Sequence, residues 1–185
     1  MSRVFISYRR DDNPDGGKLV YERLKTLLPS WEIFYDRKSL GIGSNFPEEL
    51  RQAVTDAQFV LVMIGPKWLE LLKDRKDSGE TDFVHEEIGT AFATGSGVIP
   101  VAVGKVARRT ASDKEEASGS DSEEATFPSK SDLAEFPDIV GLAELNGKQV
   151  RPDPDFDKDV EALVGYLEVA AQVLLLVPFS LASTK

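Results

Sequence analysis

The sequence contains no cysteine and only one histidine, His85, and these two scarcities exclude much of protein chemistry. Disulfides and thiolate-bound metals need cysteine, and the usual zinc sites need several imidazoles. A Ser-His-Asp triad would have to be built on His85. We therefore expect no bound metal and no resident cofactor. A chain without cysteine also suits the reducing cytoplasm, which is the location we expect.

The sequence also has fewer basic than acidic side chains. The 22 Lys and Arg residues face 32 Asp and Glu residues, which gives a formal net charge of −10. That balance argues against nucleic acid as a partner, because phosphate binding needs a concentrated basic face. The apolar run at residues 173–177 is bounded by Gln172 and Pro178 and, with its flanks, is too short to span a bilayer. The first seven residues also lack the basic and apolar regions of a signal peptide.

What the sequence does have is an alternation of short apolar runs with segments of helical periodicity. Residues 59–64 are apolar throughout, which is typical of a strand covered on both faces. Such alternation predicts an α/β fold: a flavodoxin-like five-stranded parallel sheet of order 2-1-3-4-5, with helices on both faces. Residues 9–17 and 36–45 are expected to be loops, and 73–81 a polar stretch. Strands are expected at 4–8, 31–35, 59–64, 98–103 and 149–150, and helices at 20–28, 46–57, 84–92 and 160–171.

Two regions depart from this alternation within an expected domain of residues 1–168. An insertion is expected at 106–130, and its part 111–125 holds six acidic residues and one lysine. This composition is typical of a disordered, solvated loop, and the alternative is an acidic segment that binds a partner. Residues 169–185 are expected to extend the last helix and end in an apolar tail. That tail would contact either further sequence or another subunit, and the sequence leaves both open.

In a flavodoxin-like sheet, ligands bind beyond the carboxyl ends of the strands, near the switch point between the first and third. A phosphorelay receiver would need an aspartate at the end of its third strand, whereas this strand ends with Met63, Ile64 and Gly65. The receiver interpretation therefore fails. Residues 41–46 resemble half of a dinucleotide fingerprint, but they follow the second strand and lack the third glycine. A flexible loop is the better interpretation of that segment.

Three segments resemble the TIR (Toll/interleukin-1 receptor) family, in its bacterial form. Residues 5–12, FISYRRDD, look like the opening box of the family, and residues 34–46 resemble its second strand and BB loop. Residues 83–88, FVHEEI, followed by 99–101, resemble the helix and fourth strand of the TIR domains that cleave NAD⁺. The likeness is good over residues 3–103 and loose over 130–168. It implies NAD⁺ glycohydrolysis or cyclisation, and TIR–TIR association in innate immune or antiphage signalling.

The resemblance gives Glu87 the catalytic role, and helix periodicity tests that assignment. The expected buried stripe consists of Val84, Ile88, Ala91 and Phe92. Glu87 then lies on the flank, about 85° from the centre of the stripe, whereas the neighbouring Glu86 points to solvent. Glu87 is therefore the glutamate that leans toward the crevice, and the alternative is a solvated helix carboxylate.

In this interpretation NAD⁺ is the substrate, and the remaining roles follow from the resemblance and from the chemistry of NAD⁺. Arg9 and Arg10 either hold the pyrophosphate, because guanidinium matches phosphate oxygens, or pair with Asp11, Asp12 or Asp36. Phe83 stands where enzymatic members often carry tryptophan. Trp68 is expected to be structural, and His85 to lie on the surface or at an interface. The expected substrate-binding residues are Tyr8, Arg9, Arg10, Asp36, Phe46 and Phe83.

An exposed apolar tip on the BB loop suits contacts between domains; it consists of Leu40, Gly41, Ile42 and Gly43. Homotypic TIR–TIR assembly is therefore the expected protein partnership. The alternative function is a TIR scaffold that associates through this loop and catalyses nothing.

Overall fold

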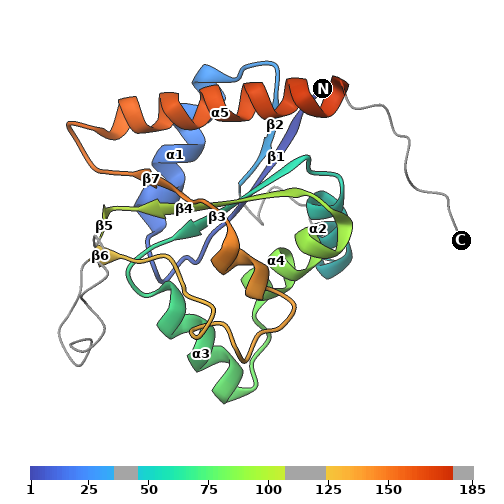
Figure 1. The fold of residues 1–185 in the computed structure, drawn as a ribbon, viewed down its shortest axis with the longest axis vertical. Helices are drawn as coiled ribbons and strands as arrows, with labels where there is room; N and C mark the ends of the chain where they lie inside the picture. Colours follow the sequence, from blue (N-terminus) through green and yellow to red (C-terminus); the bar gives the residue numbers. More distant parts are fainter. Residues whose placement is uncertain (36–45, 107–123, 177–185) are drawn as a thin grey trace, which may run out of the picture.

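A computed structural model describes residues 1–35, 46–106 and 124–176 of the chain. Its centre is a parallel five-stranded sheet of order β2-β1-β3-β4-β7 (Figure 1). With β7 as the fifth strand of this sheet, the order is the one that the sequence predicts. The strands are β1 (Arg3–Ser7), β2 (Glu32–Phe34), β3 (Phe59–Ile64), β4 (Gly97–Val103) and β7 (Lys148–Val150).

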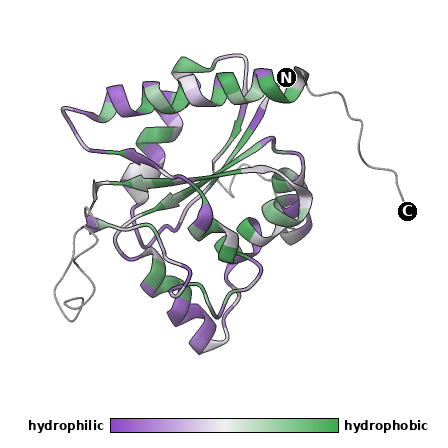
Figure 2. Cartoon of the chain, in the orientation of Figure 1, coloured by the Kyte–Doolittle hydropathy of each residue, from purple (hydrophilic) through white to green (hydrophobic). Residues whose placement is uncertain are grey.

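Helices cover both faces of the sheet, as expected (Figure 1). One face packs against α1 (Pro14–Leu27) and α5 (Phe156–Leu176). The other packs against α2 (Phe46–Thr55), α3 (Trp68–Ser78) and α4 (Phe83–Thr94). Every residue of β3 is buried, and Figure 2 shows hydrophobic colouring on the central strands and hydrophilic colouring on the outer part of α3. Burial on both faces explains why β3 is apolar throughout.

Pro100 lies within β4 at a point where the strand has one neighbour. Residues 97–102 pair with β3, whereas pairing with β7 begins only at Val101. Proline lacks the N–H that a strand between two neighbours would need, so it fits the half of β4 that forms an edge.

One helix begins earlier than expected, and another was not expected at all. The segment 9–17 was expected to be a loop, but α1 begins at Pro14, because the side chain of Asn13 accepts a hydrogen bond from the Gly16 N–H at 2.9 Å. The polar stretch 73–81 proves to be largely the second half of α3. That helix ends at Gly79, whose φ of 70° is the left-handed conformation that glycine adopts at low cost.

The insertion is shorter than the predicted 106–130. Residues 107–123, which include most of the acidic part 111–125, lie outside the described residues. Strand β5 (Lys105–Val106) pairs in parallel with β6 (Glu124–Ala125), and Ala125 is fully buried. The chain that follows packs beside α4 and includes the 3₁₀ helix η2 (Val140–Glu144). It is anchored in the same core as α4 by Leu133, Phe136, Ile139 and Leu142.

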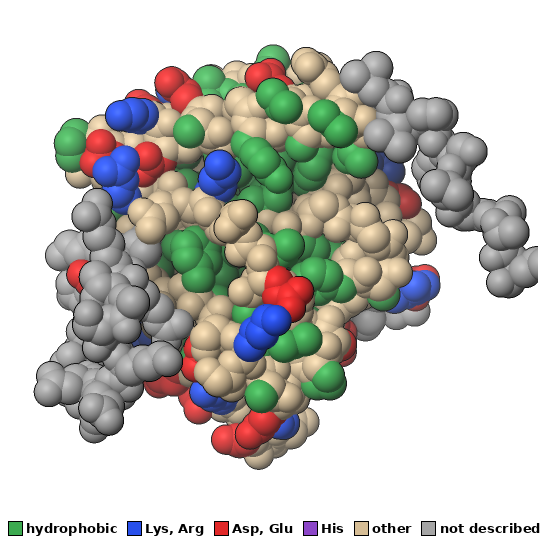
Figure 3. All heavy atoms as spheres, viewed as in Figure 1, with side chains coloured by type: hydrophobic (Ala, Val, Ile, Leu, Met, Phe, Trp, Pro, Cys, Tyr) green, Lys and Arg blue, Asp and Glu red, His purple; other side chains and the backbone are tan. Residues whose placement is uncertain are grey.

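Helix α5 continues to Leu176, within the segment 169–185 for which the sequence predicts a helix extension. Its outer side carries exposed apolar side chains, and green atoms lie along this helix in Figure 3. The exposed large apolar side chains of α5 are Tyr166, Val169, Val173 and Leu174. Within the described residues no helix is long and apolar enough to cross a membrane. Residues 177–185 and the BB-loop residues Leu40, Gly41, Ile42 and Gly43 lie outside the described part of the chain, as does Asp36.

Candidate functional site

Glu87 is a buried carboxylate at the carboxyl end of β1. Its side chain is on α4 and is 4% exposed, and Ser7, the last residue of β1, is fully buried beside it. The Ser7 Oγ donates a hydrogen bond to Glu87 Oε2 at 2.5 Å. This distance is typical of a hydroxyl that donates to an ionised carboxylate. The alternative of a solvated helix carboxylate is therefore wrong for Glu87, whereas Glu86 is exposed as expected.

The start of α4 is fixed by Asp82. Its side chain accepts hydrogen bonds from the Val84 N–H at 3.1 Å and the His85 N–H at 3.2 Å, and it therefore caps the helix. Asp82 also receives both arms of the Arg9 guanidinium, with Nη1 at 3.0 Å and Nη2 at 2.6 Å. These contacts tie the helix that carries Glu87 to the segment that follows β1.

Arg9 is thus engaged inside the fold. Its side chain is 5% exposed, and its guanidinium carbon lies 5.4 Å from the centroid of the Trp68 ring, which is itself buried. A fold-stabilising pair was one of the two expected roles for Arg9. The partner is Asp82, however, and not Asp11, Asp12 or Asp36. Trp68 is structural, as expected.

Asp12 holds the turn that follows β3. Its carboxylate accepts from the Gly65 N–H and the Lys67 N–H, both at 2.7 Å. Burial raises the pKa of Asp12 above its ordinary value, and the two backbone hydrogen bonds oppose that rise. A Cβ on Gly65 would lie 2.5 Å from Asp12 Oδ1, so the close approach of the carboxylate requires glycine there.

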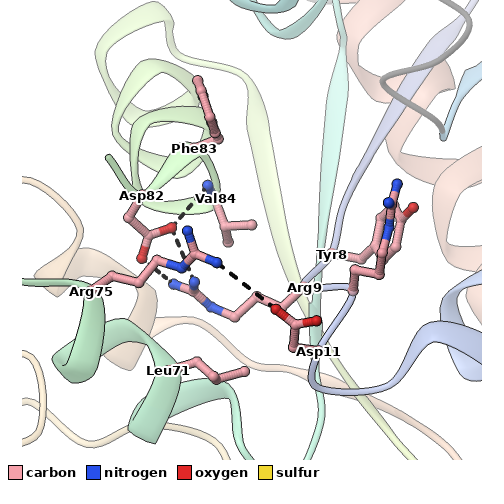
Figure 4. Close-up of a pocket in the computed structure, with 9 residues that line it drawn as sticks. Tyr8, Arg9, Asp11, Leu71, Arg75, Asp82, Phe83 and Val84 are labelled. Atoms are coloured by element: carbon pink, nitrogen blue, oxygen red, sulfur yellow. Dashed lines mark hydrogen bonds and ion pairs between the residues drawn. The ribbon is translucent and has the colours of Figure 1, made fainter. Parts of the chain in front are cut away.

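Two pockets lie beside α4. One, of about 530 Å³, lies between α2 and α4, and Glu87 lines it together with Leu50, Val54, Thr90 and Asp138, among others. The other, of about 460 Å³, lies between the segment after β1, α3 and α4 (Figure 4). It is lined by Tyr8, Arg9, Arg10, Asp11, Leu71, Arg75, Asp82, Phe83 and Val84.

The structure brings only some of the predicted site residues together. Of the predicted substrate-binding residues, Tyr8, Arg9, Arg10 and Phe83 line the second pocket, and Phe83 is one helical turn before Glu87. The ring of Tyr8 points away from Phe83 in Figure 4, and it stacks on Tyr35 with 4.6 Å between centroids. Successive residues of an extended chain face opposite sides, so Tyr8 turns away where Ser7 meets Glu87. For Phe46, the first residue of α2, the structure describes the backbone and not the side chain.

Sequence analysis missed Ser7 and Asp82 as parts of this site. Ser7 carried a weak signal, because it is the polar residue that ends an otherwise apolar strand. Asp82 carried a stronger one, since an aspartate directly before a helical stripe is a typical N-cap. His85 is half-buried, and its Nε2 lies 2.9 Å from a carboxylate oxygen of Asp138. Within the described ranges, no cluster of three or more His, Asp or Glu side chains is arranged to hold a metal ion.

A sequence-family model described as TIR domain matches residues 4–129, more than half of the chain. The chain belongs to the TIR domain family. Its fold is similar to that of the TIR domains in the activated Roq1 resistosome, which recognises the pathogen effector XopQ. The TM-score is 0.59 and the identity 15%, over 90% of this chain and 99% of that one. At this identity the likeness shows a common fold.

Two further solved structures resemble this TIR domain. A prokaryotic SEFIR domain gives a TM-score of 0.49 and 16% identity, over 88% of this chain and 96% of that one. The CMP N-glycosidase BcmB of Clostridium botulinum gives a TM-score of 0.44 and 16% identity, over 89% of this chain and 99% of that one.

Proposed function

We propose that this TIR domain is a glycohydrolase that cleaves the nicotinamide–ribose bond of NAD⁺, with Glu87 as its catalytic carboxylate. The observation that carries the proposal is the burial of Glu87, which lines the pocket between α2 and α4 and contacts Ser7, the last residue of β1. Glutamate is rarely buried unless its charge has a purpose or a partner. Ser7 lies at the carboxyl end of β1, and in a doubly wound sheet ligands bind beyond the carboxyl ends of the strands.

The chemistry asks little more of the protein than one carboxylate. Nicotinamide leaves as a neutral molecule from a cationic pyridinium, so no acid has to protonate it, in contrast to ordinary glycoside hydrolysis. The C–N bond breaks with its electron pair going to the ring nitrogen, and the ribose carbon becomes cation-like. Glu87 would stabilise that developing positive charge and bind the ribose hydroxyls. Water then adds to give ADP-ribose and a proton, or an atom of the same molecule attacks to give a cyclic product.

The rest of the substrate would extend toward the second pocket. Arg10, at its rim, is exposed and is the better of the two adjacent arginines for the pyrophosphate, because both arms of Arg9 already contact Asp82. Phe83 lines the second pocket with Arg10 and is one helical turn before Glu87, so its ring is the aromatic group proposed to contact the substrate. Asp36 and Phe46 stay in the proposal as substrate contacts on sequence grounds alone.

We further propose that activity depends on homotypic assembly through the BB loop, and that the protein acts in the cytoplasm in immune or antiphage-type signalling. An assembling enzyme gains activity more steeply than linearly as its concentration rises. Ile42→Asp, which places a charge on the apolar tip of the loop, should then reduce activity at a given concentration. Linear scaling and no effect of Ile42→Asp would count against assembly.

The second candidate function is a scaffold that associates with other TIR domains and catalyses nothing. Phe83 favours it, because enzymatic members often carry tryptophan there. Incubating the purified protein with NAD⁺ over a series of high protein concentrations, followed by chromatography of nicotinamide, separates the two functions. The proposal predicts nicotinamide together with ADP-ribose or its cyclic form, in equal amounts. Failure to release nicotinamide at any concentration favours the scaffold.

A further inference from the structure

We propose that Ser7 is a positioning residue that orients and stabilises the ionised carboxylate of Glu87. This inference rests on the proposed function, in which Glu87 is the catalytic group. It assigns to the last residue of β1 a part in the reaction, although Ser7 itself is too deeply buried to touch the substrate.

Ser7 is held rigidly on the sheet. It pairs in register with Val62 of β3, and both residues are fully buried. Phe5 and Val62 belong to the apolar core that packs against α2, α3 and α4, so the hydroxyl of Ser7 lies beside a layer that is otherwise apolar. A buried hydroxyl without a partner costs free energy, and Ser7 directs its Oγ to Glu87 Oε2 at 2.5 Å. The donor therefore lies on the most rigid element near the carboxylate.

The carboxylate and its helix are thereby held at two points. Asp82, through Arg9, fixes the N-terminus of α4, and Ser7 fixes the end of the Glu87 side chain. A catalytic group has to be held within a fraction of an ångström of its productive geometry by neighbours that are themselves locked. The hydroxyl also donates to the ionised form of the carboxyl, which favours that form over the protonated one.

The proposal predicts two effects of Ser7→Ala. The kcat for NAD⁺ cleavage falls by roughly tenfold to a hundredfold, while KM changes little, because the lost contact orients a reacting group and does not bind the substrate. The acid limb of the pH–rate profile moves to higher pH, since the carboxylate has lost a donor that favoured its charged form. Ser7→Thr keeps a hydroxyl at the same position and restores both properties.

Val62→Ala is the matched control for lost packing. It removes buried methyl groups from the residue paired with Ser7, and leaves the hydroxyl and the carboxylate in place. Val62→Ala should therefore lower the melting temperature at least as far as Ser7→Ala does, without moving the acid limb. A purely structural role for Ser7 would make the two variants behave alike, and that result would overturn the proposal.

A second measurement does not depend on activity. The titration of the Glu87 carboxyl is followed by carbon-13 NMR in the wild type and in Ser7→Ala, with Glu87→Gln to assign the resonance. The proposal expects the midpoint of Glu87 to rise in Ser7→Ala and to stay in place in Val62→Ala. An unchanged midpoint overturns it, even where the wild type cleaves NAD⁺. Conversely, a wild type that releases no nicotinamide defeats the proposed function, while this titration still decides whether Ser7 stabilises the carboxylate.

Discussion

Arg9 and Asp82 are 73 positions apart in the sequence and form a buried, two-pronged ion pair, with Nη1–Oδ1 and Nη2–Oδ2 distances of 3.0 and 2.6 Å. Both side chains are less than a tenth exposed. The pair joins the loop after β1 to the first turn of α4. The same Asp82 carboxylate also caps that turn by accepting hydrogen bonds from the Val84 and His85 N–H groups. The position of Glu87 is therefore coupled to a contact made elsewhere in the sequence.

Asp82→Ala should destabilise the domain strongly. It leaves the Arg9 guanidinium buried without its carboxylate and removes the cap of α4, and breaking a buried pair in this way costs about 3–5 kcal/mol. For a chain of this length the melting temperature should fall by on the order of 10 °C. Thermal unfolding followed by circular dichroism checks this expectation.

The control for Asp82→Ala is Glu48→Ala, which removes an exposed ion pair with Arg51 three residues along α2. That variant should leave the melting temperature nearly unchanged, because exposed pairs contribute little. Similar melting temperatures for the two variants would show that the Arg9–Asp82 pair does not hold α4.

Asp12 should make stability depend on pH in an acidic window. Its pKa is raised in the folded protein because burial disfavours the carboxylate, so the folded state holds this proton more tightly than the unfolded chain. The contribution of Asp12 is therefore fully present below its unfolded pKa of about 3.9 and is lost as pH rises through the raised folded pKa. Urea unfolding of wild type and Asp12→Asn across this range measures it. A difference between the two free energies of unfolding that does not change with pH contradicts the account.

Two glycine-to-alanine changes should have opposite effects on the free energy of unfolding. Gly65→Ala places a Cβ 2.5 Å from Asp12 Oδ1 and forces the carboxylate off the Gly65 and Lys67 amides, so we expect a loss of roughly 1–3 kcal/mol. Gly165 lies exposed in the middle of α5 with open space around it. Gly165→Ala should therefore stabilise the protein by about 0.5–1 kcal/mol. Denaturant titration of both variants tests the pair, and a destabilised Gly165→Ala would mean that the side of α5 at Gly165 is not open to solvent.

The sheet was predictable from the sequence because its central strands are short runs of apolar residues. A run such as 59–64 is apolar at every position, and burial on both faces is the physical reason. Helix α3 was not predicted, because only Trp68 and Leu72 of its residues are buried. Two buried positions followed by the five charged residues 73–77 resemble a polar loop more than a helix. The one sign of a helix in the sequence was Gly79, at the position of a C-cap.

The candidate site was predictable in part. The resemblance pointed to Glu87, and helix phase separated it from Glu86. Periodicity within one helix could not reveal that α2 and the end of β1 enclose the flank on which Glu87 lies, since burial there depends on other segments. The partner of Arg9 was missed for the same reason: nearer acidic residues were available in the sequence, and the fold brings a distant one, Asp82, into contact.

The most direct test of the central claim compares nicotinamide release from NAD⁺ by Glu87→Gln and Glu86→Gln under identical conditions. Glutamine keeps the volume of the buried side chain and an oxygen that accepts from Ser7, so both variants should fold, which their melting curves check. We predict that Glu87→Gln loses activity by on the order of a hundredfold or more, because it removes the charge that stabilises the ribosyl cation. Glu86→Gln should match the wild type. Wild-type activity in a folded Glu87→Gln protein, or a loss confined to Glu86→Gln, would contradict the account.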